Sequence, residues 1–210
     1  PKAAREAAIR RREIESACLS PDGQTIAIAT SSRMAASTVI EIWVVDTQQQ
    51  IHALIPNKGG ADQIRYSPDG KQLVSAGNST ARGWVDGNRD ISSPDYQDSV
   101  ILWDIETGLE VRKFASRESG EHGRRQVHDV CFSPDGKFLV TAEQVGTSLV
   151  YETQTGKQRS TLNGHDGAVY AVAISTDGKR LITAGADHTA LIWDCDSVFR
   201  AEPRDSLPPR

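Results

Sequence analysis

One short block recurs four times along this chain and constrains its fold more than any other feature. Each copy ends in Ser-Pro-Asp-Gly or the variant Ser-Thr-Asp-Gly, and an apolar run that ends in Trp or Tyr follows downstream. Two motifs that repeat in fixed order about every 40 to 65 residues indicate four copies of one supersecondary unit. The blocks lie at 17–23, 65–70, 131–136 and 173–178, and the apolar runs at 40–43, 100–103, 148–151 and 190–193.

The Ser-Pro-Asp-Gly step predicts a tight turn that closes a β-hairpin. Proline presets φ at the first turn position, Asp suits the second, and glycine accepts the left-handed conformation that follows. In the fourth copy, proline-free apolar runs at 169–174 and 180–183 flank the turn, and we expect them to form strands a and b. The run ending in Trp or Tyr is then strand c. Strand d is expected at 50–55, 109–115 and 157–162, and in a short, degenerate form at 197–201.

Four short strands in each unit, several of them apolar on both faces, predict sheets that lie between neighbouring sheets. Such a sheet is the blade of a β-propeller. We therefore predict an all-β fold: a β-propeller segment of four antiparallel four-stranded blades that is part of a larger propeller. A closed four-bladed ring is the alternative. The expected divisions are a basic helical or linker segment at 1–13, blades at about 14–56, 57–115, 116–162 and 163–199, and a disordered tail at 200–210.

The units resemble those of the WD-repeat (β-transducin-like) family, which places Gly-His before strand a and Trp-Asp at the end of strand c. The resemblance covers about residues 14–196 and is most complete in the fourth copy. It implies a structural hydrogen-bond chain across that blade, because a buried indole N–H and a buried hydroxyl need partners. The residues expected to form this chain are His165, Thr183, Asp187 and Trp193. The first copy departs from the pattern with Trp43-Val44, and the third has Tyr151 in place of Trp.

Composition and charge limit the classes of partner. The chain has 210 residues, a net charge of −4 and a pI near 5.8, so we expect no affinity for nucleic acid. No apolar stretch reaches the roughly 18 residues that a membrane span needs, so we expect no membrane partner. Three cysteines cannot all pair with one another, which favours a reducing compartment and predicts a cytoplasmic protein.

Two insertions mark the expected binding face. They are the b–c loop of the second blade at 78–98 and the loop into the third blade at 115–126, which emerge on the same face of the predicted blades. We expect a protein or peptide partner there, bound by residue types that are enriched at interface hot spots. The candidate contact residues are Trp84, Arg82, Arg89, Tyr96, Arg117, Arg124 and Arg125.

Other interpretations of these insertions stay open. Trp84 is large and apolar enough to pack back onto its own blade, and the arginines of the second insertion can be solvated beside acidic neighbours. Residues 86–90 place oxygen ligands at the spacing of a calcium loop. However, Ile91 and Gln97 stand where such loops require Gly and Glu, so no metal site is predicted.

The sequence contains no nucleophile elbow, phosphate-binding loop or metal-ligand cluster. We therefore predict no enzyme, no catalytic residue and no cofactor. The predicted function is a non-catalytic protein-protein or peptide interaction scaffold. The alternative is an accessory regulatory or substrate-docking propeller of a larger enzyme. Apolar outer faces on the first and last blades also predict contact with remaining propeller blades or self-association.

Overall fold

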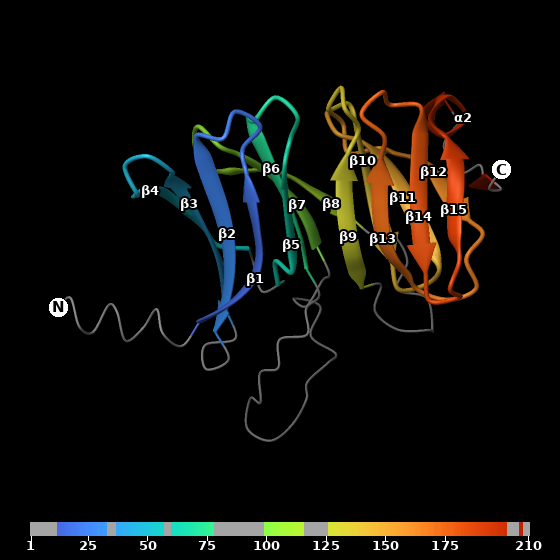
Figure 1. Ribbon diagram of the computed structural model, residues 1–210, viewed down its shortest axis with the longest axis horizontal. Helices are drawn as coiled ribbons and strands as arrows, with labels where there is room; N and C mark the ends of the chain where they lie inside the picture. Colours follow the sequence, from blue (N-terminus) through green and yellow to red (C-terminus); the bar gives the residue numbers. More distant parts are fainter. Residues whose placement is uncertain are drawn as a thin grey trace, which may run out of the picture.

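The structure is a computed structural model that describes residues 12–32, 37–56, 60–77, 99–115, 126–200 and 206–207. Within these ranges the chain forms four sheets whose neighbouring strands are antiparallel, apart from one short parallel strand, together with one short helix. Figure 1 shows the sheets in a row along the long axis, with the first and fourth at opposite ends. The predicted all-β fold is confirmed, and the sheets are arranged as consecutive blades of a propeller segment.

Three blades have the predicted order of strands a, b, c and d. The first contains β1 (Arg12–Leu19), β2 (Thr25–Ser32), β3 (Ser37–Val44) and β4 (Gln49–Leu54). The second contains β5 (Gln63–Tyr66), β6 (Gln72–Gly77), β7 (Ser99–Asp104) and β8 (Glu110–Ala115). The third contains β9 (Val127–Phe132), β10 (Phe138–Glu143), β11 (Thr147–Glu152) and β12 (Gln158–Asn163). The fourth contains three strands, β13 (Val169–Ile174), β14 (Arg180–Gly185) and β15 (Ala190–Asp194).

The four a–b turns share one geometry. In each turn the serine hydroxyl donates to the aspartate two residues later at 2.6 Å and accepts the N–H of the first residue of strand b. The glycine that follows the aspartate has φ between 70° and 72°, a conformation that residues with a Cβ rarely adopt. The repeated block therefore fixes both the turn and the start of the next strand.

Three apolar cores lie between successive blades. In each core, the aromatic residue at the end of strand c packs toward the preceding blade. The second blade thus buries Trp103, the third Tyr151 and the fourth Trp193, each at most 5% exposed. Strands inside the row are consequently covered on both faces, as β10 shows with its last five residues buried.

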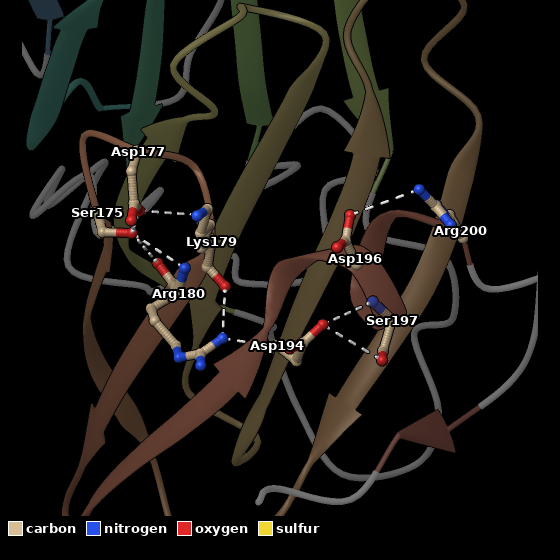
Figure 2. Close-up of polar contacts among 8 residues, drawn as sticks. All are labelled: Ser175, Asp177, Lys179, Arg180, Asp194, Asp196, Ser197 and Arg200. Carbon is tan, nitrogen blue, oxygen red and sulfur yellow. Dashed lines mark hydrogen bonds and ion pairs between the residues drawn. The ribbon is translucent and has the colours of Figure 1, made fainter.

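The expected strand d of the fourth blade is wrong, because residues 195–200 form the helix α2 (Cys195–Arg200). In the second blade the c–d turn ends at Gly108, which has φ +69°. Val198 stands at the corresponding position of the fourth blade, and a β-branched residue disfavours positive φ. Asp194 instead accepts the N–H of Ser197 at 3.2 Å, as the residue before a helix does (Figure 2).

Contacts with the third blade stabilise this helix. Val198 is 1% exposed, and its carbonyl oxygen accepts the hydroxyl of Ser160 on β12 at 3.1 Å. Phe199 stacks on Phe138 with ring centroids 4.4 Å apart and an interplanar angle of 4°. The chain after β15 therefore packs back on the third blade.

The tail also departs from expectation at two residues. We expected 200–210 to be disordered, whereas Ser206–Leu207 forms β16, which pairs in parallel with β12 at Thr161 and Leu162. The proline-rich, charged sequence of the tail does not indicate that it pairs with β12. The N-terminal boundary also shifts slightly, because β1 begins at Arg12, inside the segment expected to be helix or linker.

Candidate interaction face

A β-bulge recurs at the start of strand a in three blades. In the first blade Ile14 pairs with Thr30 and Ser16 with Ala29, so Glu15 is the extra residue. The same shift leaves His128 unpaired in the third blade and Tyr170 unpaired in the fourth. A bulge re-aims the side chain of its extra residue out of the regular ladder. All three lie at the end of strand a opposite the Ser-Pro-Asp-Gly turn, which is the face of the b–c and d–a loops.

Tyr170 and His128 form an aromatic pair on this loop face. Their ring centroids are 5.1 Å apart at 70°, an edge-to-face arrangement that aromatic rings favour. Nε2–H of His128 donates to Oε1 of Gln144 at 2.6 Å, which holds the imidazole in place. Tyr170 is nevertheless 55% exposed, an unusual state for a large aromatic side chain. An exposed ring on a fixed scaffold is suited to contact a partner.

The four residues of the expected structural chain come together in the fourth blade. Nε1–H of Trp193 donates to Oγ1 of Thr183 at 2.9 Å, and the Thr183 hydroxyl donates to Nε2 of His165 at 2.9 Å. Nδ1–H of His165 then donates to the carboxylate of Asp187 at 3.0 Å. Every polar hydrogen in the series has an acceptor only if His165 is the neutral Nδ1–H tautomer.

Asp187 is the charged end of this chain. Its desolvation alone would raise its pKa, but hydrogen bonds outweigh that effect and hold the pKa well below its ordinary value. The donors are the backbone N–H of Asp166, the hydroxyl and N–H of Thr189, and the imidazole of His165. Asp187 therefore joins the loop before β13 to the b–c turn of the same blade.

The other blades retain parts of this arrangement. Nε1–H of Trp103 donates to Oγ of Ser75 at 2.9 Å in the second blade, where Ser75 takes the place of Thr183. In the third blade Tyr151 packs against Phe114 at 5.4 Å between ring centroids. In the first blade Nε1–H of Trp43 donates to Glu41 at 3.3 Å. In the described parts of these blades, such contacts stand at the position of the Trp193–Thr183 bond.

The carboxylate of Asp129 links strand a of three blades. Asp129 on β9 accepts Nη2–H of Arg65 on β5 at 3.2 Å and the backbone N–H of Val172 on β13 at 3.1 Å. Ser16 plays a similar part between the first two blades, accepting the N–H of Ile64 at 3.4 Å. These bonds fix neighbouring strands a relative to one another, and so they fix the bulged residues of the loop face.

The seven candidate contact residues predicted from the two insertions lie outside the described residues. They are Trp84, Arg82, Arg89, Tyr96, Arg117, Arg124 and Arg125. The strands that carry the insertions are described: β6 and β7 flank the first, and β8 and β9 flank the second. Both insertions therefore leave the scaffold at the ends of these strands, on the loop face.

Sequence reasoning missed Tyr170 and His128 as candidate contacts. The sequence pattern assigned both residues to the start of strand a. A bulge inserts one extra residue, and the two-residue alternation of apolar and polar side chains does not show where it occurs. A signal did exist, because Tyr170, His128 and Glu15 each stand five residues before the turn serine of their unit. Aligning the repeats by that serine would have grouped them.

The described residues were also searched for a metal site and for a membrane-spanning helix. Among the described residues, no group of three or more His, Cys, Asp or Glu side chains is arranged to hold a metal ion. No helix in the described part of the chain is long and apolar enough to cross a membrane.

Comparison with known proteins agrees with the fold. The family model described as "WD domain, G-beta repeat" matches residues 116–146 and 156–194. WD repeat-containing protein 1-A of Xenopus laevis is 34% identical over 184 residues, which cover 74% of this chain and 30% of that protein. One of the subunits of chromatin assembly factor 1 from Gallus gallus is 19% identical over 173 residues, covering 72% of this chain and 27% of the relative.

A shorter match is to a bromodomain and WD repeat-containing protein of Dictyostelium discoideum, 37% identical over 75 residues. It covers 36% of this chain and 3% of that protein. The chain thus spans less than a third of the length of each of these relatives. The family assignment rests on the four consecutive blades, the Trp-Thr-His-Asp series and the matched repeats. The chain belongs to the WD-repeat family.

Proposed function

We propose that this chain is a non-catalytic scaffold that binds a protein or peptide on its loop face, around the second and third blades. The observation that carries the proposal is the repeated bulge, which places Glu15, His128 and Tyr170 of the first, third and fourth blades at the end of the blades where β6, β7, β8 and β9 flank the two insertions. The two long insertions leave the scaffold at this end as well. WD-repeat relatives include one component of a chromatin assembly factor, which by its name works within a complex.

The chemistry of the described part of this face suggests what it contacts. The exposed ring of Tyr170 offers an apolar surface and a π face to a partner side chain, either aliphatic or cationic. His128 is held by Gln144, so the edge-to-face pair is preorganised and little side-chain entropy is lost on binding. We propose that the insertion residues supply the rest of the contact surface.

A substitution on each face tests the assignment. Tyr170→Ala should weaken binding of partners that the full chain captures. Leu109→Ala is the matched control, because Leu109 is 67% exposed and follows the c–d turn on the opposite face. If Leu109→Ala reduces capture as much as Tyr170→Ala does, the loop face is not the binding face.

A deletion tests the insertion itself. Replacing residues 79–97 by a two-residue Asn-Gly turn should preserve folding, because closing a shorter loop changes the entropy little. The shortened protein should lose most partner binding if the first insertion contributes contacts such as those of Trp84. Capture of the same partners at unchanged affinity would show that this insertion is not part of the site.

The second candidate is an accessory regulatory or substrate-docking propeller of a larger enzyme. One observation favours a further domain beside the blades: the matched segment covers 3% of a relative whose name combines WD repeats with a bromodomain. The full reading frame distinguishes the two candidates, because a catalytic domain beside the blades favours the accessory role. For either role we propose a reducing compartment such as the cytoplasm, in keeping with the free Cys18, Cys131 and Cys195.

A further inference from the structure

The a–b turns of successive blades lie against one another on the side opposite the loop face. A Cβ built on Gly136 would lie 3.8 Å from Cδ of Pro68 in the preceding turn, and a Cβ built on Gly70 would lie 3.4 Å from Cδ of Pro21. We call this side, formed by the turns at 20–23, 67–70, 133–136 and 175–178, the turn face. The side chains that fill the space below the turns differ from one blade boundary to the next.

The first residue of strand b contacts the following blade at two of the three boundaries. Between the first and second blades, the hydroxyls of Thr25 and Tyr66 are hydrogen-bonded at 3.0 Å. Between the third and fourth blades, Phe138 stacks on Phe199 of α2. The side chain at this position thus has a partner across both boundaries.

The boundary between the second and third blades lacks such a pair. Gln72 begins strand b there, and among the described residues it bonds Ser67 through its main chain while its side-chain amide has no partner. Phe132 stands in the third blade where Tyr66 stands in the second, and it has no hydroxyl. A cavity of about 290 Å³ remains at this boundary. Its lining includes Pro68, Asp69, Gln72, Pro134, Asp135 and Gly136.

Two carboxylates give the cavity wall a negative charge. Oδ1 of Asp69 and Oδ1 of Asp135 each accept the serine hydroxyl and a backbone N–H of their own turn. Oδ2 of Asp69 has no partner among the described residues. Oδ2 of Asp135 accepts Nζ of Lys137 at 3.3 Å, but the Lys137 side chain is 75% exposed and an ion pair of this kind is weak.

Both carboxylates are ionised at neutral pH. The hydrogen bond from Ser67 lowers the pKa of Asp69. Burial alone would raise the pKa of Asp135, but hydrogen bonds from Ser133 and Lys137 lower it. The cavity therefore offers two anionic groups and the unpartnered amide of Gln72.

We propose that this cavity binds one arginine side chain of a partner protein. Its volume is at the low end of the range of ligand sites, about 300 to 1,000 Å³, which suits a single long side chain. Pro68 and Pro134 contact the aliphatic part of the arginine. The planar guanidinium has five N–H donors, enough for Asp69, Asp135 and the amide oxygen of Gln72. The site lies on the turn face and is independent of the contacts proposed for the loop face.

The position of the cavity indicates that the arginine comes from another protein. A further blade would lie beside the first or the fourth blade, whereas this boundary is inside the row. Segments 33–36, 57–59, 78–98 and 116–125 connect strand ends on the loop face. Segment 201–205 joins α2 to β16, and both of these contact β12 of the third blade. Residues 1–11 contain three arginines and precede the loop-face end of β1, so the experiment tests them directly.

The probe is the capped peptide Gly-Gly-Arg-Gly-Gly, and saturation-transfer NMR measures its binding to the full chain. We expect a Kd of about 1 mM for one side-chain contact of this kind. The same peptide with citrulline in place of arginine keeps the shape of the side chain and lacks its charge. It should bind at least about tenfold more weakly.

Two aspartates in equivalent turns provide matched variants of the protein. Asp177 accepts the Ser175 hydroxyl in the fourth blade as Asp69 accepts that of Ser67 in the second, but Asp177 does not line the cavity (Figure 2). Asparagine keeps the Oδ1 acceptor of the turn and removes the charge. Asp69→Asn should therefore weaken binding of the arginine peptide about tenfold, and Asp177→Asn should leave it unchanged.

A double substitution tests the cavity itself. Gln72→Thr together with Phe132→Tyr would recreate the hydroxyl pair that Thr25 and Tyr66 form at the first boundary. This variant should fold, and it should lose binding of the arginine peptide because the space and the amide are both removed. Thermal unfolding checks that every variant is folded. If the double variant does not fold, the citrulline peptide and the two aspartate variants still decide the question.

Four outcomes would overturn the proposal. They are no saturation transfer to the arginine peptide, equal binding of the citrulline peptide, equal losses in Asp69→Asn and Asp177→Asn, and unchanged binding by a folded double variant. Deletion of residues 1–11 addresses the remaining occupant. Unchanged binding of the peptide supports an external arginine, whereas binding that is about tenfold tighter would assign the cavity to the chain's own N-terminal segment and overturn the partner assignment.

Discussion

The indole N–H of Trp193 donates to the hydroxyl oxygen of Thr183 at 2.9 Å inside the fourth blade. Trp103 and Ser75 repeat this bond at 2.9 Å in the second blade. In the fourth blade the hydroxyl also donates to Nε2 of His165, which extends the pair into a chain that ends at Asp187. The same position therefore carries different amounts of stabilisation in the two blades.

Replacing Thr183 by Val tests the chain with little change in shape. Thr183→Val leaves the indole N–H and the imidazole nitrogen without partners, and we expect the free energy of unfolding to fall by about 2 to 4 kcal/mol. Ser75→Ala is the matched control and, among the described residues, leaves only the Trp103 N–H without its partner, at about 1 to 2 kcal/mol. Urea denaturation measures both. Equal losses in the two variants would contradict a larger role for the chain in the fourth blade.

Asp187 predicts how stability depends on pH. Its pKa in the folded protein lies below the ordinary value of 3.8, so its ionised form favours the folded state. A carboxylate of this kind stabilises the fold at pH values above its unfolded pKa, and the contribution disappears as the pH falls through its folded pKa. We expect Asp187→Asn to unfold at lower urea than the wild type at neutral pH.

The same comparison gives the control. The difference between wild type and Asp187→Asn should begin to shrink as the pH falls below 3.8, since the wild-type carboxylate then becomes protonated in the unfolded chain. Urea midpoints of both proteins at several pH values measure this difference. A gap that remains constant down to about pH 3 would show that the charge of Asp187 is not what stabilises the blade.

Substitutions at two glycines distinguish the loss of stability caused by a steric clash from the loss caused by an unfavourable backbone conformation. A Cβ on Gly77 would lie 1.7 Å from the carbonyl oxygen of Gly60, a distance that requires the backbone to move. Gly23 has φ +72°, and a Cβ there would meet nothing within 4 Å. We expect Gly77→Ala to cost about 3 kcal/mol or more, and Gly23→Ala about 1 to 2 kcal/mol. Thermal unfolding of both variants checks the order, and a larger loss in Gly23→Ala would reverse the explanation.

The blades were predictable because their turns carry local chemistry. The Ser-Pro-Asp-Gly block specifies a hydroxyl bond, a carboxylate bond and a left-handed glycine, none of which depends on distant residues. Helix α2 was not predictable in this way. Its sequence lacks the turn glycine at Val198, but its formation also depends on burial of Val198 and on the stacking of Phe199 against the third blade. The sequence pattern of a single repeat does not predict such contacts with a neighbouring blade.

The residues of the candidate site also differ in how far the sequence predicts them. The Trp-Thr-His-Asp series could be located because each residue type must satisfy a buried polar group at a fixed place in the unit. Tyr170 could be grouped with His128 and Glu15 by its distance from the turn serine, but its exposure could not be predicted, because that exposure follows from a bulge that shifts the register by one residue. The bulge is a property of how β13 pairs with β14, and the sequence of β13 alone reads as a regular apolar strand.

The last prediction concerns the outer faces of the row. Central strands of the middle blades are buried on both faces, whereas β14 alternates between buried and exposed residues because one of its faces has no neighbouring blade in the described part of the chain. Ile182 and Ile192 are the large apolar residues on that face, and Figure 1 places this blade at the end of the row, opposite the first. Apolar surface of this kind favours association by about 25 cal/mol for each Å² that is covered.

We therefore expect the 210-residue chain by itself to form oligomers at micromolar concentration. Ile182→Lys should reduce this association, since a charge on the outer face must lose its hydration when the face is covered. Leu109→Lys is the matched control, because Leu109 is 67% exposed but lies after a c–d turn rather than on the outer face. Sedimentation velocity decides the matter: a monomer of 22.8 kDa at every concentration would contradict open apolar faces and favour a ring closed by these four blades alone.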